Sequence, residues 1–556
     1  MATQGYKEVV DDESLINLIE RGVQNSTGDW LNSSELARER LKATYEYAGV
    51  PDFHLAPQGV STIVDTSTTE VVEAYTAVLS DLFLNNQKLA RFVPYDETPG
   101  AFGAAKDASN IVNYCLFKKN NGWEILQQWM KSALLWKNAI CRWDYITDFE
   151  YIFEEFEEIS QTKLDEILSN DSMEIVGKLE YENKVVGEAD GLGPEVELIY
   201  VNVRVRKKID HSRVKIELIP PENFRISRDA TKLEDASYIG IQTDMTRSEV
   251  RKYWPEEAKS IDSWDDLNDS DNWLGSMKYA EDTAARKQVT GQEYWQGSNS
   301  NDVIPNEANR DVTITESWMR VDRDGDGIAE LKRFITIGTH ILLEEDIDFI
   351  NLASIVPIDI PHEFYGLSMA DFARSSTLAS TAILRGFVEN TYLTNYSPKL
   401  ADPNVVDFSA LQNMKPKQII PTNGNPQGAV AALPPETIST GTVPLLQHLQ
   451  MIKEQATGMS KAAQGLNDTL YVSGNSEAKM SAVQSAAQKR IQHIARRFAE
   501  TGFKTLIAGI YMTMYKNMKG KLPYNMQGVY GSVNMETLPS KMDVEIHLDI
   551  GENSNS

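Results

Sequence analysis

The longest helical pattern in the chain runs from Ser476 to about Lys516 without a proline. Apolar side chains recur along it at intervals of three and four residues, which places them on one face of a helix. These positions are Met480, Val483, Ala487, Ile491, Ile494, Phe498 and Leu506. Ser476 is suited to cap the amino end, and the interior Gly502 indicates a bend or a close contact with another element.

A polar stretch bounded by glycines precedes this helix. It begins near Gly465 and ends at Gly474 and Asn475. Glycine permits backbone conformations that other residues avoid. We therefore predict a flexible loop over residues 464–476 that leads directly into the long helix.

Similar spacing predicts further helices, separated by turn signals. They cover residues 14–50, 65–90, 102–120, 122–140, 148–170, 275–295, 367–393 and 443–457. The segment 148–170 is strongly acidic with one apolar face, so we expect an exposed amphipathic helix there. A capping box formed by Thr246 and Glu249 predicts one more short helix.

Apolar and polar residues alternate in several other segments, which is the pattern of half-buried strands. These segments are 141–147, 196–206, 214–219, 312–321, 331–337 and 542–550. Residues 256–310 are polar and poor in core residues, so we expect partners to hold that region as much as its own core does. The pattern thus mixes helices and strands, and we expect an α+β fold that is mostly helical.

Composition and charge narrow the range of possible functions. A chain of 556 residues can form several domains. Its net charge of −27 disfavours a protein that wraps nucleic acid with a basic surface, although it suits one that lets nucleic acid pass without binding it tightly. With only Cys115 and Cys141, we expect neither disulfides nor a zinc site. We expect no signal peptide and no membrane span.

Three carboxylates, Asp322, Asp324 and Asp326, precede Gly327 in the order that opens a calcium-binding loop. The twelfth position of such a loop should be Glu, and here it is Arg333. Predicted strands rather than helices flank the segment, and Asp and Gly also suit a tight hairpin turn. We therefore expect a turn and no bound metal or cofactor, with a cation at the three carboxylates as the alternative.

The search for catalytic motifs is negative. The chain contains no phosphate-binding glycine loop of the P-loop type and no nucleophile elbow. His362 and Glu363 resemble the start of a zinc-protease motif, but Gly366 stands where the second histidine is needed. These absences disfavour an enzyme, and we predict no catalytic residue. A metal-dependent hydrolase that uses the three carboxylates stays open as an alternative.

Four stretches of the chain resemble portal proteins of tailed bacteriophages, of the P22-like short-tailed type. They are residues 36–51, 220–240, 321–333 and 357–394. The acidic hairpin in the third stretch and the passage from strand to helix in the fourth are the most specific. The order of the predicted helices and strands agrees with that of portal proteins along nearly the whole chain. Another ring or adaptor protein of the virion is the alternative within the same structural class.

The resemblance implies a homo-oligomeric ring, commonly of twelve subunits, at one vertex of the capsid. Double-stranded DNA would pass through the ring during packaging and ejection. The implied protein partners are the major capsid protein, the scaffolding protein, the large subunit of the terminase motor and a tail adaptor or head-completion protein. The ring would assemble in the cytoplasm of the bacterial host and reside in the virion, without contact with a membrane.

The resemblance also implies a division of the chain. A wing would comprise 1–265 and 395–463, and a stem would comprise 266–297 and 357–394. The clip would be 298–356, and the tunnel loop 464–476. A channel-to-crown helix over 477–517 and a short crown over 518–556 would complete the subunit.

The tunnel loop carries the candidate channel residues. They are Gly465, Asn467, Asp468, Tyr471, Gly474 and Asn475, flanked by Lys461 and Lys479. In a ring, each flanking lysine would repeat as a belt of positive charge that touches phosphates briefly. The alternative is that both lysines lie on solvated helix faces.

Overall fold

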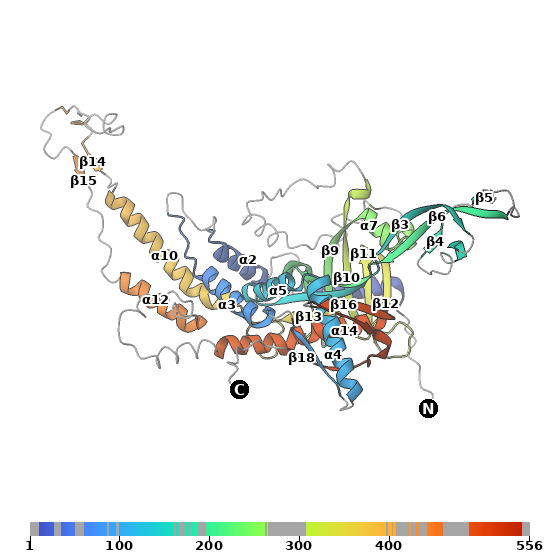
Figure 1. Ribbon diagram of the computed structural model, residues 1–556. Helices are drawn as coiled ribbons and strands as arrows, with labels where there is room; N and C mark the ends of the chain where they lie inside the picture. The colour runs from blue at the N-terminus through green and yellow to red at the C-terminus, as the bar shows by residue number, and fades with distance from the viewer. Residues whose placement is uncertain are drawn as a thin grey trace, which may run out of the picture.

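The computed structural model describes most of the chain. The described residues are 10–26, 35–50, 61–85, 88–95, 99–160, 163–165, 173–176, 180–186, 196–261, 264, 307–395, 399–402, 404–406, 422–423, 430–432, 442–459, 489–526 and 528–546. Their helices and small antiparallel sheets form an α+β protein, as the sequence predicts. A body of sheets and helices carries two projections that extend in different directions (Figure 1).

The centre of the body is a sheet of three strands that lie far apart in the sequence. β2 (Ala139–Ile146) lies between β7 (Arg213–Ile219) and β13 (Leu352–Ile355), antiparallel to both. The helices α3 (Ser67–Leu84), α5 (Gly122–Trp136) and α14 (Lys504–Asn517) share the largest apolar core with this sheet. The predicted strand at 141–147 is therefore confirmed, and it is the middle strand of this sheet.

The described part of the long helix starts at 489, continues through a π-helical segment (Ala499–Phe503) and ends with α14. Gly502 lies in the π segment, where a side chain would collide with Ile355 and come within 2.8 Å of the carbonyl oxygen of Ser354. Gly509 lies directly against the indole of Trp143. The predicted close contact at Gly502 is confirmed. Residues 476–488 of the predicted helix lie outside the described residues.

A second sheet joins two distant parts of the sequence. Its antiparallel strands follow the order β12-β11-β10-β9-β8. They are β8 (Phe224–Ile226), β9 (Tyr238–Thr246), β10 (Asp311–Val321), β11 (Glu330–Ile337) and β12 (His340–Asp346). The helix α1 (Asp12–Asn25) packs on Tyr238, and α7 (Arg247–Tyr253) begins with the predicted capping box. Strands of the expected wing and of the expected clip thus belong to one sheet.

One projection consists of two helices. α10 (Met369–Asn395) leaves the body and ends beside the small pair β14 (Lys399–Ala401) and β15 (Val430–Ala432). α12 (Thr442–Thr457) runs alongside α10 toward the body (Figure 1). We call α10, β14, β15 and α12 the arm. Both of its helices agree with the predictions from spacing.

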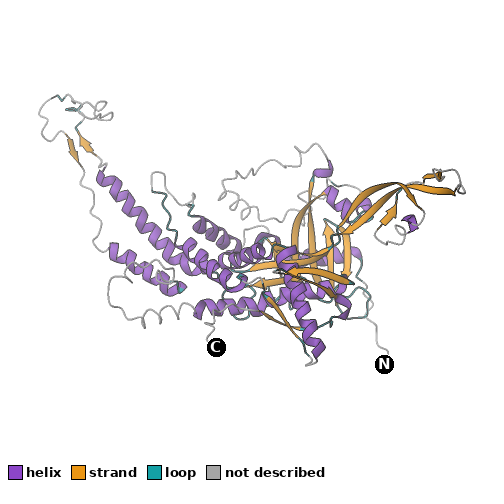
Figure 2. Ribbon diagram, in the orientation of Figure 1, coloured by secondary structure: helices purple, strands orange, loops and turns teal. Residues whose placement is uncertain are grey.

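The other projection is a β ribbon, and it overturns the helix predicted at 148–170 over residues 149–160. Its strands are β3 (Phe149–Ser160), β4 (Met173–Ile175), β5 (Glu180–Val186) and β6 (Val196–Asp210). β3 pairs with β6 over most of its length and extends away from the body (Figure 2). Phe149, Tyr151 and Phe153 lie on one face, each beneath a cation of β6. This cross-strand pairing, absent from a helix, stabilises the strand.

The remaining described elements complete the body. They are α2 (Glu35–Ala48), β1 (Ala90–Val93), α4 (Pro99–Tyr114) with a π turn (Cys115–Lys119), β16 (Lys521–Met526), β17 (Val529–Asn534) and β18 (Asp543–Ile546), together with the 3-10 turns Pro221–Asn223, Glu257–Ser260, Glu307–Asn309 and Met535–Thr537. Cys115 and Cys141 are both buried and free. No helix among the described residues has the length and apolarity to cross a membrane. The helix predicted at 275–295 lies outside the described residues.

Candidate functional site

The structure describes the base on which the predicted loop is mounted. Gly465, Asn467, Asp468, Tyr471, Gly474, Asn475, Lys461 and Lys479 all lie outside the described residues. The chain before them is described up to Met459, and the chain after them from Lys489. These two ends meet at the end of α12, beside α3.

The first end is held by a buried tyrosine. The hydroxyl of Tyr75, on α3, donates a hydrogen bond to the carbonyl oxygen of Thr457 at 2.6 Å. Burial raises the pKa of Tyr75 to about 12, against a smaller opposite effect of Arg490. The phenol is therefore neutral and remains a donor at physiological pH. It donates to the carbonyl of Thr457, the last residue of α12, for which the helix itself offers no donor.

The second end is held by an arginine. Nη1 of Arg490 donates to the carbonyl oxygen of Ala456 at 2.7 Å. Gly458, with φ +75°, turns the chain out of α12, and its amide donates to the carbonyl oxygen of Glu454 at 2.8 Å. Met459 and Ile491 are both buried in the main core. Residues 460–488 therefore start and return at one place on the body.

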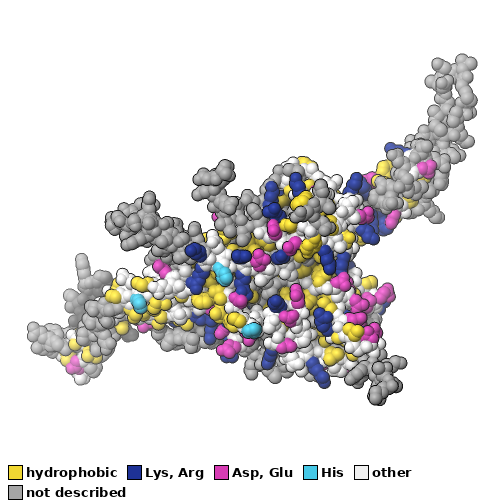
Figure 3. Space-filling view, turned by 90° about the horizontal axis from the view of Figure 1, so that it is seen from below, with side chains coloured by type: hydrophobic (Ala, Val, Ile, Leu, Met, Phe, Trp, Pro, Cys, Tyr) yellow, Lys and Arg dark blue, Asp and Glu magenta, His cyan; other side chains and the backbone are white. Residues whose placement is uncertain are grey.

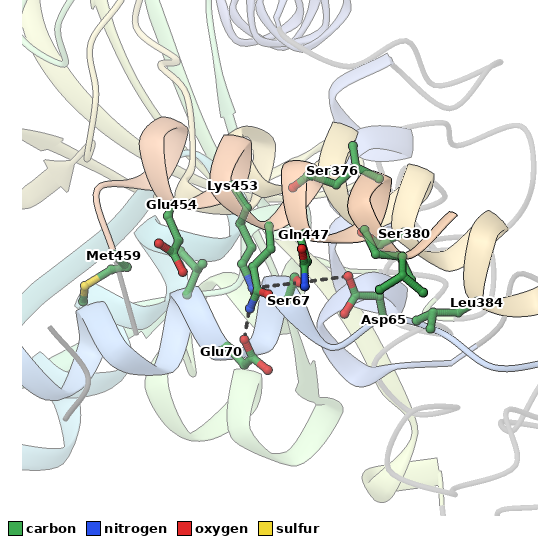
Figure 4. Close-up of a pocket in the computed structure, with 15 residues that line it drawn as sticks. Asp65, Ser67, Glu70, Ser376, Ser380, Leu384, Gln447, Lys453, Glu454 and Met459 are labelled. Carbon is green, nitrogen blue, oxygen red and sulfur yellow. Dashed lines mark hydrogen bonds and ion pairs between the residues drawn. The ribbon is translucent and has the colours of Figure 1, made fainter. Parts of the chain in front are cut away.

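A cavity of about 560 Å³ lies beside this base, between α3, α10 and α12 (Figure 4). Its lining is mixed, with hydroxyl, amide, carboxylate and apolar groups. The lining residues are Asp65, Ser67, Glu70, Val71, Ser376, Ser380, Leu384, Val443, Leu446, Gln447, Leu449, Gln450, Lys453, Glu454 and Met459. Lys453 is 8% exposed, and its Nζ lies 3.0 Å from Ser67 Oγ and 3.2 Å from Glu70 Oε2.

Both helices of the arm bury polar side chains and leave several large apolar side chains exposed. Along α10 after its first turn, the buried side chains are Ala373, Ser376, Thr377 and Thr381. On α12 they are Lys453 and Thr457. The exposed large apolar side chains of the two helices are Leu378, Phe387, Tyr392, Leu393, Val443, Leu445, Met451 and Ile452. Buried hydroxyl and ammonium groups beside exposed apolar side chains depart from the usual amphipathic pattern of a surface helix.

The outer surface of the arm is also poor in charge for so acidic a chain. α10 contains Asp371, Arg374, Arg385 and Glu389, and α12 contains Lys453 and Glu454 as charged residues. Hydrophobic side chains lie along this part of the molecule, whereas carboxylates gather at the opposite end of the body (Figure 3). Large exposed apolar side chains gathered on one part of a molecule mark a contact site for another protein surface.

The acidic turn between β10 and β11 is confirmed as a hairpin. Asp322 accepts the amides of Gly325 and Gly327, each at 2.7 Å, and both glycines have positive φ. Burial is the largest single effect and raises the pKa of Asp322, but the amide hydrogen bonds together outweigh it and lower the pKa overall. Asp324 and Asp326 accept amides two residues ahead, at 3.1 and 2.7 Å.

These hydrogen bonds account for the positions of the three carboxylates without an ion. One oxygen from each lies within 4.8 Å of the others, but every carboxylate already accepts a backbone amide. Arg333, at the twelfth position, does not face the turn. Its guanidinium pairs with Asp144, at 2.9 Å, and with Glu316. Exposed clusters of this kind are common in turns.

Reasoning from the sequence missed Tyr75, Lys453 and Arg490. A signal for Lys453 existed, because it follows Leu446 and Leu449 at helical spacing and so falls on their face of α12. A charged residue on that face indicates a buried polar contact. Tyr75 and Arg490 carry no such signal, since their partners are backbone carbonyls far away in the sequence.

Comparison with known proteins adds one finding. The family model described as phage SU10 portal protein matches residues 15–556. A search of curated proteins found no match. The family match covers nearly the whole chain, so it includes the body, the ribbon, the arm and the base of the loop together.

Proposed function

Because the chain belongs to the phage SU10 portal protein family, we propose that its copies form a closed ring at one capsid vertex through which double-stranded DNA enters and leaves. Portal proteins are structural components of tailed phage particles, where they connect head to tail. They are not enzymes. The proposed ring has twelve subunits and contacts the capsid protein, the terminase motor and a tail adaptor.

The observation that carries this proposal is the set of exposed apolar side chains on the arm. Leu378 is 56% exposed and Tyr392 is 60% exposed, although both belong to the long, regular helix α10. In a single subunit these side chains contact water at a free-energy cost. In a ring, the arms of neighbouring subunits lie side by side and bury them, so the pattern is the one expected of a protein that exists as an assembly.

The position of the arm also favours a division of the chain into stem and clip that differs from the one expected from sequence. The strands of 311–346 belong to the sheet that contains β8 and β9, within the body. The part that projects beyond the body is α10 and α12, with β14 and β15 at its far end (Figure 1). We propose that α10 and α12 form the stem, and that 396–441, between them, takes the place of the clip.

The charge of the chain supports passage of DNA without tight binding. Each subunit carries a net charge of −27, and a ring multiplies this negative field around the channel. The arm itself contains few charges, so a channel lined by arms would neither attract nor strongly repel the phosphates. We propose that Lys461 and Lys479 supply the brief positive contacts, on a loop mounted at the base formed by Tyr75, Thr457 and Arg490.

Images or mass measurements of the purified protein test the ring directly. We expect a closed ring with a central hole, and a protein that stays monomeric at high concentration contradicts the proposal. The arm is tested by Tyr392→Asp with Leu393→Asp, which places charge among its exposed apolar side chains and should prevent ring formation. Ile328→Asp is the matched control, because Ile328 is 67% exposed at the acidic turn, away from the arm.

The loop is tested separately. Lys461→Ala with Lys479→Ala, and a deletion of 467–473, should leave ring formation intact and reduce packaging or retention of DNA. Normal packaging in both variants contradicts a role of the loop in handling DNA. Loss of rings in the deletion variant contradicts it as well, since the loop would then serve assembly instead.

A further inference from the structure

The contact between the arm and α3 is built from polar groups. The hydroxyls of Thr68 and Thr377 lie 3.2 Å apart, and the amide of Asp65 donates to Thr381 Oγ1 at 3.0 Å. Lys453 reaches Ser67 and Glu70 from α12 (Figure 4). We call this set of contacts the seam.

The seam resists separation less than an apolar interface does. Hydrogen bonds and ion pairs that open are replaced by bonds to water, so each contributes little net stability. Separation of apolar surfaces has no such compensation. The cavity of about 560 Å³ next to the seam also leaves room for the helices to shift without collision.

The root of the arm is anchored differently. Met369 and Ala370, at the start of α10, are fully buried in the main core. Arg374 donates to Glu46 Oε1 at 3.1 Å and to the carbonyl oxygen of Glu39 at 2.9 Å. At the other end, Met459 lies in the same core. An element that is firmly anchored at its root and weakly held along its side can hinge about the root.

From these observations we propose that the arm pivots about its root and that Lys453 holds it closed against α3. Opening breaks the contacts of Lys453 with Ser67 and Glu70 and of Thr377 with Thr68, while the root stays in the core. The loop base at the end of α12 belongs to the root, because Met459 stays in the core. A pivot of the arm therefore changes the angle at which α12 leaves the loop base, while the loop starts from the same place.

Spin labels measure the pivot without reference to function. Thr394→Cys on the arm and Tyr95→Cys on the body place labels at exposed sites, while Cys115 and Cys141 are buried. Labelled protein is diluted with an excess of unlabelled protein, so that distances within one subunit dominate. Adding Lys453→Met should shift or broaden the distance distribution. An unchanged distribution overturns the proposal.

A reversible cross-link between the arm and α3 tests whether DNA packaging requires the pivot. Thr68→Cys with Thr377→Cys replaces the two adjacent hydroxyls by thiols, and oxidation should join them and lock the seam. We expect locked subunits to form rings but to package at least tenfold less DNA, with recovery on reduction. Thr68→Cys alone, oxidised in the same way, should package normally.

Several results contradict the pivot. Locked rings that package like wild type show that the arm need not move, and failure of the two thiols to join on oxidation shows that the seam is not closed. This packaging measurement rests on the proposed portal function. If wild type forms no ring, the proposed function fails, and the spin-label distances still decide the pivot.

Discussion

We predict that loss of the hydrogen bond between Tyr75 and Thr457 loosens the loop base. Tyr75→Phe removes one oxygen atom and keeps the ring in the core, where Tyr75 is fully buried. Thr457 is fully buried as well, and its carbonyl loses the hydrogen bond of 2.6 Å. A buried carbonyl left without a donor costs about 1–3 kcal/mol. The end of α12 should therefore open more often than in wild type.

Hydrogen exchange measures this opening. Since about 1.4 kcal/mol corresponds to a factor of ten, amides near the end of α12 should exchange roughly five to 150 times faster in the variant. The amide of Gly458, which donates to Glu454 at 2.8 Å, is the most direct probe. Because the pKa of Tyr75 is raised to about 12, the acceleration relative to wild type should be the same at pH 6 and pH 9.

Tyr530→Phe is the matched control, because Tyr530 is 79% exposed on β17, and its removal should leave exchange at α12 unchanged. Equal exchange in wild type and Tyr75→Phe would refute the anchoring of Thr457 by Tyr75. Uniformly faster exchange over α5 would also refute it, because the loss would then be one of global rather than local stability.

Three further predictions concern the body. Gly509→Ala should destabilise the protein by about 1–3 kcal/mol, measured by thermal melting, because the new methyl group collides with a buried indole; Gly103→Ala, in an open helical position, should be neutral or stabilise by up to about 1 kcal/mol. Asp322 has a lowered pKa when folded, so it stabilises the hairpin above pH 3.8 and loses this effect as the pH falls through its folded pKa. The melting difference between wild type and Asp322→Asn should accordingly be present at pH 7 and vanish in acid. Burial raises the pKa of Cys115 to about 12 and that of Cys141 further, so neither thiol should react with maleimide until the protein is unfolded; rapid labelling of the native protein would contradict their burial.

Local patterns were sufficient for much of the fold. The helices at α3, α5, α10 and α12 follow from spacing alone, because each has a continuous apolar or small-residue face. The capping box at Thr246 is also purely local, since both partners lie within four residues. The acidic turn belongs to the same group, because its carboxylates bond amides only two to five residues ahead.

The segment 148–160 could not be decided in this way. Phe149, Ile152, Phe153 and Phe156 fit one face of a helix, while Phe149, Tyr151 and Phe153 fit one face of a strand. The choice depends on β6, about fifty residues later, whose Arg204, Arg206 and Lys208 lie over the three rings. No window of local sequence contains that partner.

The sequence by itself determined the class of fold, the family resemblance and the turn at Asp322, because the responsible contacts are local or lie in strings that can be compared. The tertiary structure alone decided which face of the arm is covered. Helical spacing indicates that α10 and α12 exist, but it assigns apolar residues to the inside by default. Here Lys453 and Thr377 face the body instead, because Ser67, Glu70 and Thr68 on α3 supply the hydrogen-bond partners that make burial of polar groups possible.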